Sequence, residues 1–561
     1  MQEEIKKYIS KTLADLGYPE VDFAVDLPRE ISHGDFSTNI GLVLSKRVGK
    51  SPVEIAQSIL DALKDTSTPS FAKIEMAGPG FINFYLAKDY VEQEIKKLPE
   101  TFDTEFTNKK IITEFTDPNP FKQFHIGHLM SNAIGESVSR LYELGGADVT
   151  RVCYQGDIGP HVAKCIWGMM QQRDAFPQDH DSIDDKMKYL GDSYVYGSNQ
   201  YEENPDAQAA IKEINKKLFE KSDPELQIYY DKGRAWSLEY FDTVYAKLGT
   251  SFKQLFFESE THAIGKTIVE ENITNGVFAK SEESDAIIYE GEKDGLHTRV
   301  FINSQGLPTY EAKELGLAME KEKLGNFDTS VVVTANEQSD YFRVLLAVIS
   351  KIMPEVAAKT KHVAHGMMQF ADGKMSSRKG NIITGDELLA QVEAKVIEKI
   401  AEREYTDAEK SEIISAVSIG ALKYSILKQT PGKNIIFDFE KSISFEGDSG
   451  PYIQYAYTRA QSVLNKAGDI DASAQNKKET YDIEKLLIRF EPIIKRAISE
   501  LAPQHVATYL IELAGAFNSW YAQEKIIGDE NEAYKLLVTK KVAYTLKQGL
   551  FALGIKVPGK M

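Results

Sequence analysis

The sequence predicts a multidomain α/β protein, in which a domain with a parallel β-sheet follows a small α+β domain and precedes a helical region. Three observations predict this fold class. The chain has 561 residues, more than one hydrophobic core usually supports. Strand-like and helical patterns alternate up to about residue 385. After that point nearly every apolar pattern has helical spacing.

Residues 1–100 make up the predicted α+β domain. Helical patterns cover 1–16 and 52–64, and the run 73–86 reads as two strands joined by a turn at Gly78-Pro79-Gly80. The first pattern mixes acidic residues among apolar ones, as an amphipathic helix does and a secretion signal does not. We therefore expect the protein to reside in the cytoplasm.

The parallel-sheet domain is expected over residues 105–390. The run KKIITEFT predicts a strand, a helix begins near Ile126 and can end at Gly145-Gly146, and DVTRVCYQGD resumes strand character. Such a strand–helix–strand unit places the intervening loop, DPNPFKQFHIGHLMSN, at the carboxyl end of the first strand, where α/β sheets bind ligands. Polar residues 170–250 read as a helical insertion, after which DAIIYE, RVFIN and TSVVVTAN complete the domain. Residues 391–440 predict a helical connecting segment and 441–561 a helical domain.

Charge and composition exclude several classes of protein. The chain carries 84 acidic and 66 basic residues, a net charge of −18, which argues against indiscriminate attraction to nucleic acid but leaves room for a local basic face. No apolar stretch is long enough to span a bilayer, so we expect no membrane partner. Cys153 and Cys165 support neither a disulfide framework nor a cysteine zinc site.

Two separated loops carry the strongest chemical signal. His125-Ile126-Gly127-His128 stands at the start of a helix, and GKMSSRKGN (373–381) follows about 250 positions later. A helix start attracts phosphate through its free N–H groups and partial positive charge, glycine permits close approach, and imidazoles can donate hydrogen bonds. Together with the lysines and arginine of the second loop, these groups suit the electrostatic work of displacement at a nucleoside triphosphate.

These residues resemble a known family. A HIGH motif followed by a KMSKS-like loop resembles the class I aminoacyl-tRNA synthetases, and the chain is similar to arginyl-tRNA synthetase over nearly its whole length. The specific marks are HGDFSTNIG (33–41) and AGPGFINFYL (77–86) for an amino-terminal tRNA-binding domain, and SFEGDSGPYIQYAYTRA (444–460) for a helical anticodon-binding domain. The resemblance implies a Rossmann-like catalytic domain and two reactions. The carboxylate of L-arginine attacks the α-phosphate of ATP and releases pyrophosphate, and a ribose hydroxyl at the end of tRNA(Arg) then attacks the adenylate.

The resemblance also implies roles for single residues. The catalytic positions are His125, His128, Lys374, Lys122, Arg378 and Lys379. The ATP-binding positions are His125, Gly127, His128, Lys374, Met375 and Ser376. Arginine is expected to meet Glu114, Asn119 and Gln338 around its amino group, and Tyr310 and Glu314 at its guanidinium. A planar cation with five donors needs a carboxylate and further acceptors. Mg²⁺ accompanies the nucleotide, and no residue is assigned as a metal ligand.

The tRNA contacts follow from aromatic residues that can stack on unpaired bases. We expect exposed Phe81 and Asn83 to contact tRNA in the amino-terminal domain, and Tyr452, Tyr455 and Arg459, with Tyr457, to do so in the carboxy-terminal domain. The competing interpretation is packing: a strand aromatic usually faces the core, and tyrosines three apart on one helical face commonly contact another helix.

The chain departs from the family pattern at two places. Lys313-Glu314 stands where the family usually has Arg-Asp, so the carboxylate lies one methylene further out. Ser377 stands where KMSKS has a lysine, which leaves Lys122, Arg378 or Lys379 to supply the positive charge. Two alternatives stay open: a class I synthetase for another amino acid such as lysine, and a synthetase-like RNA-binding protein without catalysis. We expect a monomer.

Overall fold

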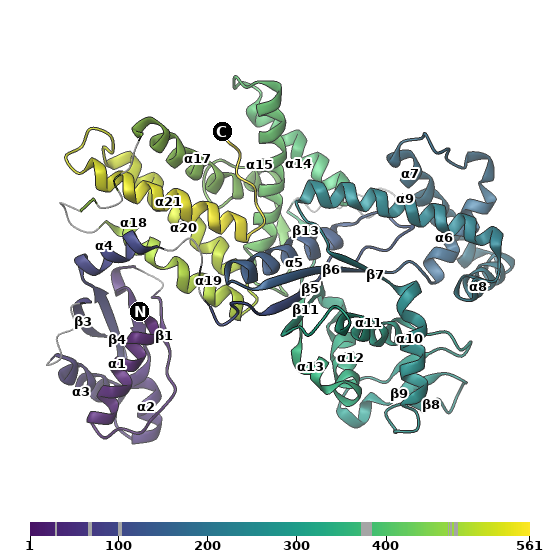
Figure 1. The fold of residues 1–561 in the computed structure, drawn as a ribbon, viewed down its shortest axis with the longest axis horizontal. Coiled ribbons are helices and arrows are strands. Elements are labelled where there is room, and N and C mark those ends of the chain that lie inside the picture. The colour runs from purple at the N-terminus through teal and green to yellow at the C-terminus, as the bar shows by residue number, and fades with distance from the viewer. Residues whose placement is uncertain are drawn as a thin grey trace. The chain divides into compact units, whose positions relative to one another are not determined.

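The computed structural model describes residues 1–28, 31–64, 70–98, 102, 104–371, 384–468, 471, 474–475 and 481–561 (Figure 1). The chain forms two compact units. The first comprises residues 1–100, 455–493 and 509–548, and the second comprises 101–454, 494–508 and 549–561. None of the described helices combines the length and apolar character that crossing a membrane requires.

The first unit contains an antiparallel sheet of four strands in the order β1-β2-β4-β3. The strands are β1 (Val25–Asp26), β2 (Phe36–Thr38), β3 (Phe71–Ala77) and β4 (Phe81–Leu86). The helices are α1 (Gln2–Asp15), α2 (Ile40–Val48), α3 (Pro52–Lys64) and α4 (Lys88–Lys97), with the short η1 (Ile31–His33). The two predicted helices and the paired strands around Gly78-Pro79-Gly80 are confirmed, whereas α2, α4 and the two short strands were not predicted.

The carboxy-terminal part of the chain is helical, as predicted. Its helices are α17 (Gly450–Ala467), α18 (Asp482–Ile488), α19 (Phe490–Ser499), α20 (Gln504–Gln523) and α21 (Glu532–Ala552). Within the first unit, Arg489 follows α18 and its Nη2 donates to the carbonyl oxygen of Gly34 at 3.2 Å. This guanidinium therefore joins the helical part of the unit to its amino-terminal part.

A parallel sheet of five strands in the order β12-β11-β5-β6-β7 forms the centre of the second unit. The strands are β5 (Lys110–Glu114), β6 (Asp148–Gln155), β7 (Gln254–Phe257), β11 (Thr329–Ala335) and β12 (Thr360–His365). The predicted crossover helix is α5 (Ile126–Leu144), which ends at Gly145. Strand order reverses between β5 and β11, the position at which open α/β sheets bind ligands.

Only one of the three later strand-like runs completes this sheet. TSVVVTAN contains β11, but DAIIYE and RVFIN supply β9 (Ile287–Tyr289) and β10 (Arg299–Ile302) of a separate antiparallel sheet with β8 (Ala279–Lys280). These short strands pack on a core that they share with α11 (Tyr310–Glu322), α12 (Ser339–Ile352) and Val332 of β11, and that includes Phe278, Phe301 and Phe342. Strand character alone could not show which sheet they join. A parallel pair, β13 (Met368–Phe370) and β14 (Ile435–Phe437), lies further along the chain.

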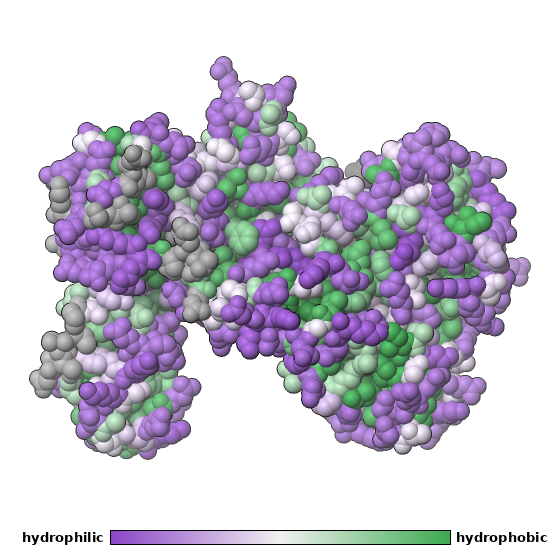
Figure 2. All heavy atoms as spheres, in the orientation of Figure 1, coloured by the Kyte–Doolittle hydropathy of each residue, from purple (hydrophilic) through white to green (hydrophobic). Residues whose placement is uncertain are grey.

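The predicted insertion consists of three long helices, α7 (Ile183–Glu203), α8 (Pro205–Glu220) and α9 (Pro224–Leu248). Each begins at a polar cap, Ser182, Asn204 or Asp223, whose side chain accepts first-turn N–H groups. Figure 2 shows mainly hydrophilic residues over α7 and α8 and more apolar surface over α10 to α12.

The remaining helices of the second unit surround the sheets and the inserted helices. They are α6 (Pro160–Gln171), α10 (Glu258–Glu271), α11 (Tyr310–Glu322), α12 (Ser339–Ile352), α13 (Pro354–Lys359), α14 (Gly385–Ile400), α15 (Asp407–Leu427) and α16 (Phe439–Ser442), with the short η2 (Arg173–Ala175), η3 (Gly291–Asp294) and η4 (Asn336–Gln338).

Candidate active site

A cavity of about 580 Å³ opens at the carboxyl ends of β5, β6 and β11. Eight of the sequence-predicted residues line it: Glu114, Asn119, His125, Gly127, His128, Tyr310, Glu314 and Gln338. They come from β5, the loop before α5, α5 itself, α11 and η4. Residues up to 224 positions apart, from Glu114 to Gln338, therefore meet at one site. The first of the two signature loops lies in this site, as predicted.

The two histidines form a cap at the start of α5. His125 is the N-cap residue, and its Nδ1 accepts the N–H of Gly127 at 3.1 Å, while Nδ1 of His128 accepts the N–H of His125 at 3.2 Å. The rings stack with centroids 3.5 Å apart. Because each Nδ1 is an acceptor, the proton of each neutral ring is on Nε2, which can donate to a ligand.

This cap corrects one expectation about the phosphate site. The first-turn N–H groups of Gly127 and His128 are already used, by the His125 ring and by the His125 carbonyl oxygen at 3.0 Å. The imidazole Nε2–H groups are therefore the side-chain donors that the cap leaves for a ligand. Gly127 is needed here because an added Cβ would lie 2.9 Å from the His125 ring. Burial, with the charges of His125 and Lys122, holds the pKa of His128 well below its usual value, so its ring is neutral.

The loop between β5 and α5 has strained backbone. Thr116, Asp117 and Phe121 have φ values of 80°, 45° and 67°, a region that residues other than glycine rarely occupy. Side chains hold this conformation: Ser131 Oγ accepts the Thr116 N–H at 2.9 Å, and Ser237 Oγ accepts the Phe121 N–H at 2.9 Å. A cost of about 1–3 kcal/mol per strained residue persists only where neighbours fix the backbone.

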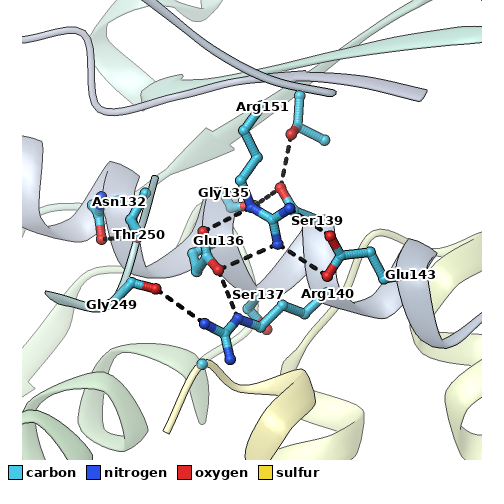
Figure 3. A network of polar contacts seen from close by, with 12 residues as sticks. Asn132, Gly135, Glu136, Ser137, Ser139, Arg140, Glu143, Arg151, Gly249 and Thr250 are labelled. Atoms are coloured by element: carbon cyan, nitrogen blue, oxygen red, sulfur yellow. Dashed lines mark hydrogen bonds and ion pairs between the residues drawn. The ribbon is translucent and has the colours of Figure 1, made fainter. Parts of the chain in front are cut away.

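A polar network holds α5 further along the helix, around Glu136 (Figure 3). Glu136, 2% exposed, accepts hydrogen bonds from Arg140 Nε at 2.6 Å and Arg151 Nε at 3.0 Å. Arg140 Nη2 continues to the carbonyl oxygen of Gly249 at 3.0 Å, and Arg151 reaches Glu143. These contacts join α5 to β6 and to the end of the inserted helices.

The cavity is acidic, and half of its carboxylates have a cationic partner. Its six carboxylates are Glu114, Asp117, Glu258, Glu311, Glu314 and Glu337. Lys321 pairs with Glu114, Lys313 with Glu258 at 2.5 Å, and Arg299 with Glu311 at 3.2 Å. No ion pair joins a described cation to Asp117, Glu314 or Glu337. Among the described residues, the cavity therefore has more carboxyl groups than cationic partners.

Glu314 is the least compensated of the inner carboxylates. No hydrogen bond or ion pair joins it to another described residue, whereas Asp117 Oδ1 accepts the Tyr154 N–H at 2.7 Å. Burial and the charge of Glu114 raise the pKa of Glu314 well above its ordinary value, although Lys321 opposes the shift. Burial and Glu114 likewise raise the pKa of Asp117. Both side chains would be stabilised by a cation in the cavity.

The structure describes Lys122 but not the second signature loop. Lys122 is half-buried, and its Nζ lies 5.0 Å from the centroid of the Tyr194 ring on α7. The predicted residues Lys374, Met375, Ser376, Arg378 and Lys379, with Ser377, fall within 372–383 and so outside the described residues. The residues that follow them are anchored at the first loop, because Gly385 N donates to the Phe124 carbonyl oxygen at 2.8 Å and Thr384 bridges His125.

The predicted tRNA contacts differ in exposure. Asn83 is 5% exposed and its Oδ1 accepts from Ser37 Oγ at 2.7 Å, so the expectation of an exposed Asn83 is wrong; the amide pairs across β2 and β4 instead. Phe81, Tyr452, Tyr455 and Arg459 are half-buried. Arg459 Nη1 donates to Asn518 Oδ1 at 2.6 Å and Nη2 to the Tyr455 hydroxyl at 3.0 Å. The tRNA contacts stay predictions.

Several cavity residues were not singled out from the sequence: Asp117, Tyr154, Glu258, Arg299, Glu311, Glu337, Tyr341 and His365. Asp117 belonged to the quoted loop, and Tyr154 to the end of a predicted strand, so the rule that ligands bind at carboxyl ends could have found them. Glu258 directly follows β7 and obeys the same rule, but that strand was not predicted. Arg299 carries no such signal, because it belongs to the separate sheet.

A family model describes most of this unit. The model for class I tRNA synthetases (R), catalytic domain, matches residues 95–439, more than half of the chain, and the model of the arginyl-tRNA synthetase amino-terminal domain matches 3–86. The chain belongs to the arginyl-tRNA synthetases. A third model, the DALR anticodon-binding domain, matches residues 453–561. The predicted family and fold class are confirmed.

Individual arginyl-tRNA synthetases match along their whole length. Curated arginine–tRNA ligases of Borreliella afzelii and Clostridium botulinum are 30% and 29% identical, over 97% and 98% of this chain and 95% and 98% of theirs. The solved structure of Thermus thermophilus arginyl-tRNA synthetase matches with a TM-score of 0.84 at 23% identity and covers all of both chains. That of Plasmodium falciparum gives 0.83 at 21%, over 100% of this chain and 99% of that one. These structures confirm the fold.

Proposed function

We propose that the acidic cavity at the carboxyl ends of β5, β6 and β11 is where this arginyl-tRNA synthetase joins L-arginine to ATP and then to tRNA(Arg). One observation carries the proposal. The cavity has uncompensated carboxylates at the α11 side and a neutral, outward-donating histidine pair at the start of α5. A cation and a phosphate chain can therefore lie side by side in it.

The arginine is held at the α11 side. Glu314 pairs with the guanidinium, Tyr310 lies on the same helix face one turn away, and Glu114, Asn119 and Gln338 receive the amino group. Gly156 supports this arrangement, because an added Cβ there would lie 2.3 Å from Asn119 Oδ1. Carboxylate oxygens that converge from separate elements suit a planar group with five donors better than a point charge.

ATP is held at the α5 side. Nε2–H of His125 and of His128 donate to the phosphates, Gly127 leaves room, and Lys122 adds positive charge. Lys374, Met375, Ser376, Arg378 and Lys379 complete the site from the second loop, with the last two or Lys122 in place of the lysine that Ser377 replaces. The arginine carboxylate attacks the α-phosphate, pyrophosphate leaves, and the charge that develops is stabilised by fixed donors, with no protein nucleophile.

Mg²⁺ accompanies the nucleotide in this proposal. No group of three or more potential ligands that could hold a metal occurs among the described residues. Mg²⁺ commonly binds through phosphate oxygens and water and needs few ligands from the protein. When bound, the ion would neutralise phosphate charge.

The other parts of the proposal concern tRNA and assembly. Phe81, Tyr452, Tyr455 and Arg459 contact tRNA, and Asn83 supports the strand instead of reaching a base. The domains are those with bounds 1–100, 105–390, 391–440 and 441–561, and the protein acts as a cytoplasmic monomer. Footprinting on tRNA(Arg), with sedimentation of the free protein, tests these points.

Arginine-dependent exchange of pyrophosphate into ATP tests the function. Each amino acid is assayed with and without tRNA, and we expect exchange with arginine alone. We expect His125→Ala to lose exchange while its affinity for tRNA stays within about twofold of the wild type. Exchange with lysine instead would overturn the assignment of the amino acid. Unimpaired exchange in His125→Ala would overturn the role of the histidine cap.

A further inference from the structure

The helical insertion reaches the phosphate side of the active site at one point. Lys122, in the loop before α5, has its Nζ 5.0 Å from the centre of the Tyr194 ring, and Tyr194 belongs to α7 of the insertion. The adjacent Gln123 lies against the same helix, since an added Cβ at Gly191 would be 3.4 Å from its Nε2. Two consecutive loop residues thus contact two positions one turn apart on α7.

Lys122 has no counter-charge among the residues that the structure describes. No ion pair or hydrogen bond joins its ammonium group to another described residue. Its charge acts on the histidine cap, because it contributes to the lowered pKa of His125, of His128 and of His161. An ammonium group of this kind is available to an anion, but its long side chain loses rotamer freedom when it is fixed.

We infer that Tyr194 is a positioning residue for Lys122. Its ring holds the ammonium group of the lysine toward the ATP phosphates by a cation–π contact and does not neutralise the charge. A carboxylate in that position would also fix the lysine, but it would compete with the phosphates for the same charge. An aromatic face attracts the cation through its quadrupole and leaves the net charge of the pair at +1. The inference rests on the proposed role of Lys122 in ATP binding.

The location of Tyr194 fits this role. Its side chain is half-buried, and it contributes to the raised pKa of Tyr310, which lines the arginine side of the cavity. Through the contact with Lys122, the insertion therefore adds a side chain beside a site that is otherwise built from the sheet domain. Sequence reasoning could not single it out among the many tyrosines of the polar helices.

Substitution of the ring tests the inference in the full-length protein with tRNA(Arg) present throughout. Tyr194→Leu keeps an apolar side chain without a π face, and we expect kcat/KM for ATP in arginine-dependent exchange to fall about three- to thirtyfold. Tyr194→Phe keeps the ring and should stay within about twofold of the wild type. The matched control is Tyr201→Leu. Tyr201 is on the same helix, α7, and its ring centre lies 4.4 Å from the Nζ of Lys164. This variant should leave exchange unchanged.

A double-mutant cycle separates positioning from packing. In a Lys122→Met background, Tyr194→Leu should change kcat/KM less than about twofold, since the group that it positions is already gone. Losses that multiply in the double variant, or an equal loss in Tyr201→Leu, would overturn the inference. If Lys122→Met alone exchanges like the wild type, the proposed role of Lys122 fails as well. If Lys122→Met is impaired but Tyr194→Leu is not, only the inference about Tyr194 fails.

Discussion

Removal of the Glu314 carboxylate should weaken arginine binding, and the loss should be smaller when the new side chain can still accept a hydrogen bond. Hydrogen bonds to charged groups are worth about 1.5–3 kcal/mol, so Glu314→Ala should raise KM for arginine about 10- to 150-fold. Glu314→Gln keeps the length and one acceptor oxygen, so it keeps a hydrogen bond from the charged guanidinium but loses the second acceptor and the negative charge. The loss of one hydrogen bond is worth about 0.5–1.5 kcal/mol, so the glutamine variant should raise KM for arginine only about two- to twelvefold.

Stability should move in the opposite direction. Glu314 has no partner among the described residues, and burial and the neighbouring Glu114 raise its pKa. The native state therefore binds a proton that the unfolded state has lost, so this group makes the protein less stable as pH rises through the raised pKa. Glu314→Gln removes that cost and should keep or raise Tm. The same titration makes KM for arginine increase in the wild type as pH falls through the raised pKa, and the variant should lose this dependence.

Exchange kinetics at several arginine concentrations and pH values, combined with thermal unfolding, check both effects. Glu320→Gln is the matched control, because this carboxylate lies on the same helix, pairs with Lys323 at 2.5 Å and does not line the cavity. It should leave KM unchanged. A Glu314→Gln variant with wild-type KM and a lowered Tm would refute the reasoning, since Glu314 would then be a structural residue.

Two further predictions concern the support of α5. Gly135→Ala should lower Tm, because the new Cβ would lie 2.1 Å from Phe115 Cγ and overpacking costs about 1–3 kcal/mol; Gly191→Ala, with no contact under 3.4 Å, should not, and equal Tm values would contradict the packing argument. Lys423, 1% exposed, donates to the carbonyl oxygens of Leu248 at 2.7 Å and Gly554 at 2.9 Å, and burial lowers its pKa to about 7. Because the unfolded chain keeps the proton up to the ordinary value of 10.5, the free energy of unfolding should increase from about pH 7 upward. The Tm of the wild type should therefore rise relative to that of Lys423→Met between pH 7 and pH 9, and a constant difference would refute the assignment.

The sequence predicted the part of the fold that depends on local pattern. The β5–α5–β6 unit, the strands around Gly78-Pro79-Gly80 and the helical carboxy-terminal part all follow from spacing and turn residues. The partner of a strand was not predictable in the same way. DAIIYE and RVFIN have the composition of sheet strands, but their membership of a separate antiparallel sheet depends on contacts with a core that no local pattern reveals.

At the candidate site, too, positions close to a motif were predicted better than burial was. Residues next to a motif, such as Glu114 and Asn119, were predicted and do line the cavity. Asn83 was expected to be exposed together with Phe81, as a pair that could contact an unpaired base, but its amide is buried and pairs with Ser37 across the sheet. Spacing gives the face of a strand, whereas burial depends on what covers that face.

The balance of charge in the cavity explains why arginine is a better occupant than lysine. If Lys313, Lys321 and Arg299 were absent, six neighbouring carboxylates would bind protons and lose their charge; if every carboxylate were paired, no charge would remain for a substrate. The observed pairing leaves Asp117, Glu314 and Glu337 without a cationic partner among the described residues. These three come from the strained loop, α11 and η4, so their oxygens approach from separate directions. A lysine ammonium can meet such acceptors only at one point, whereas a guanidinium presents five donors in a plane, and it cannot shed its proton to relieve the cost of burial.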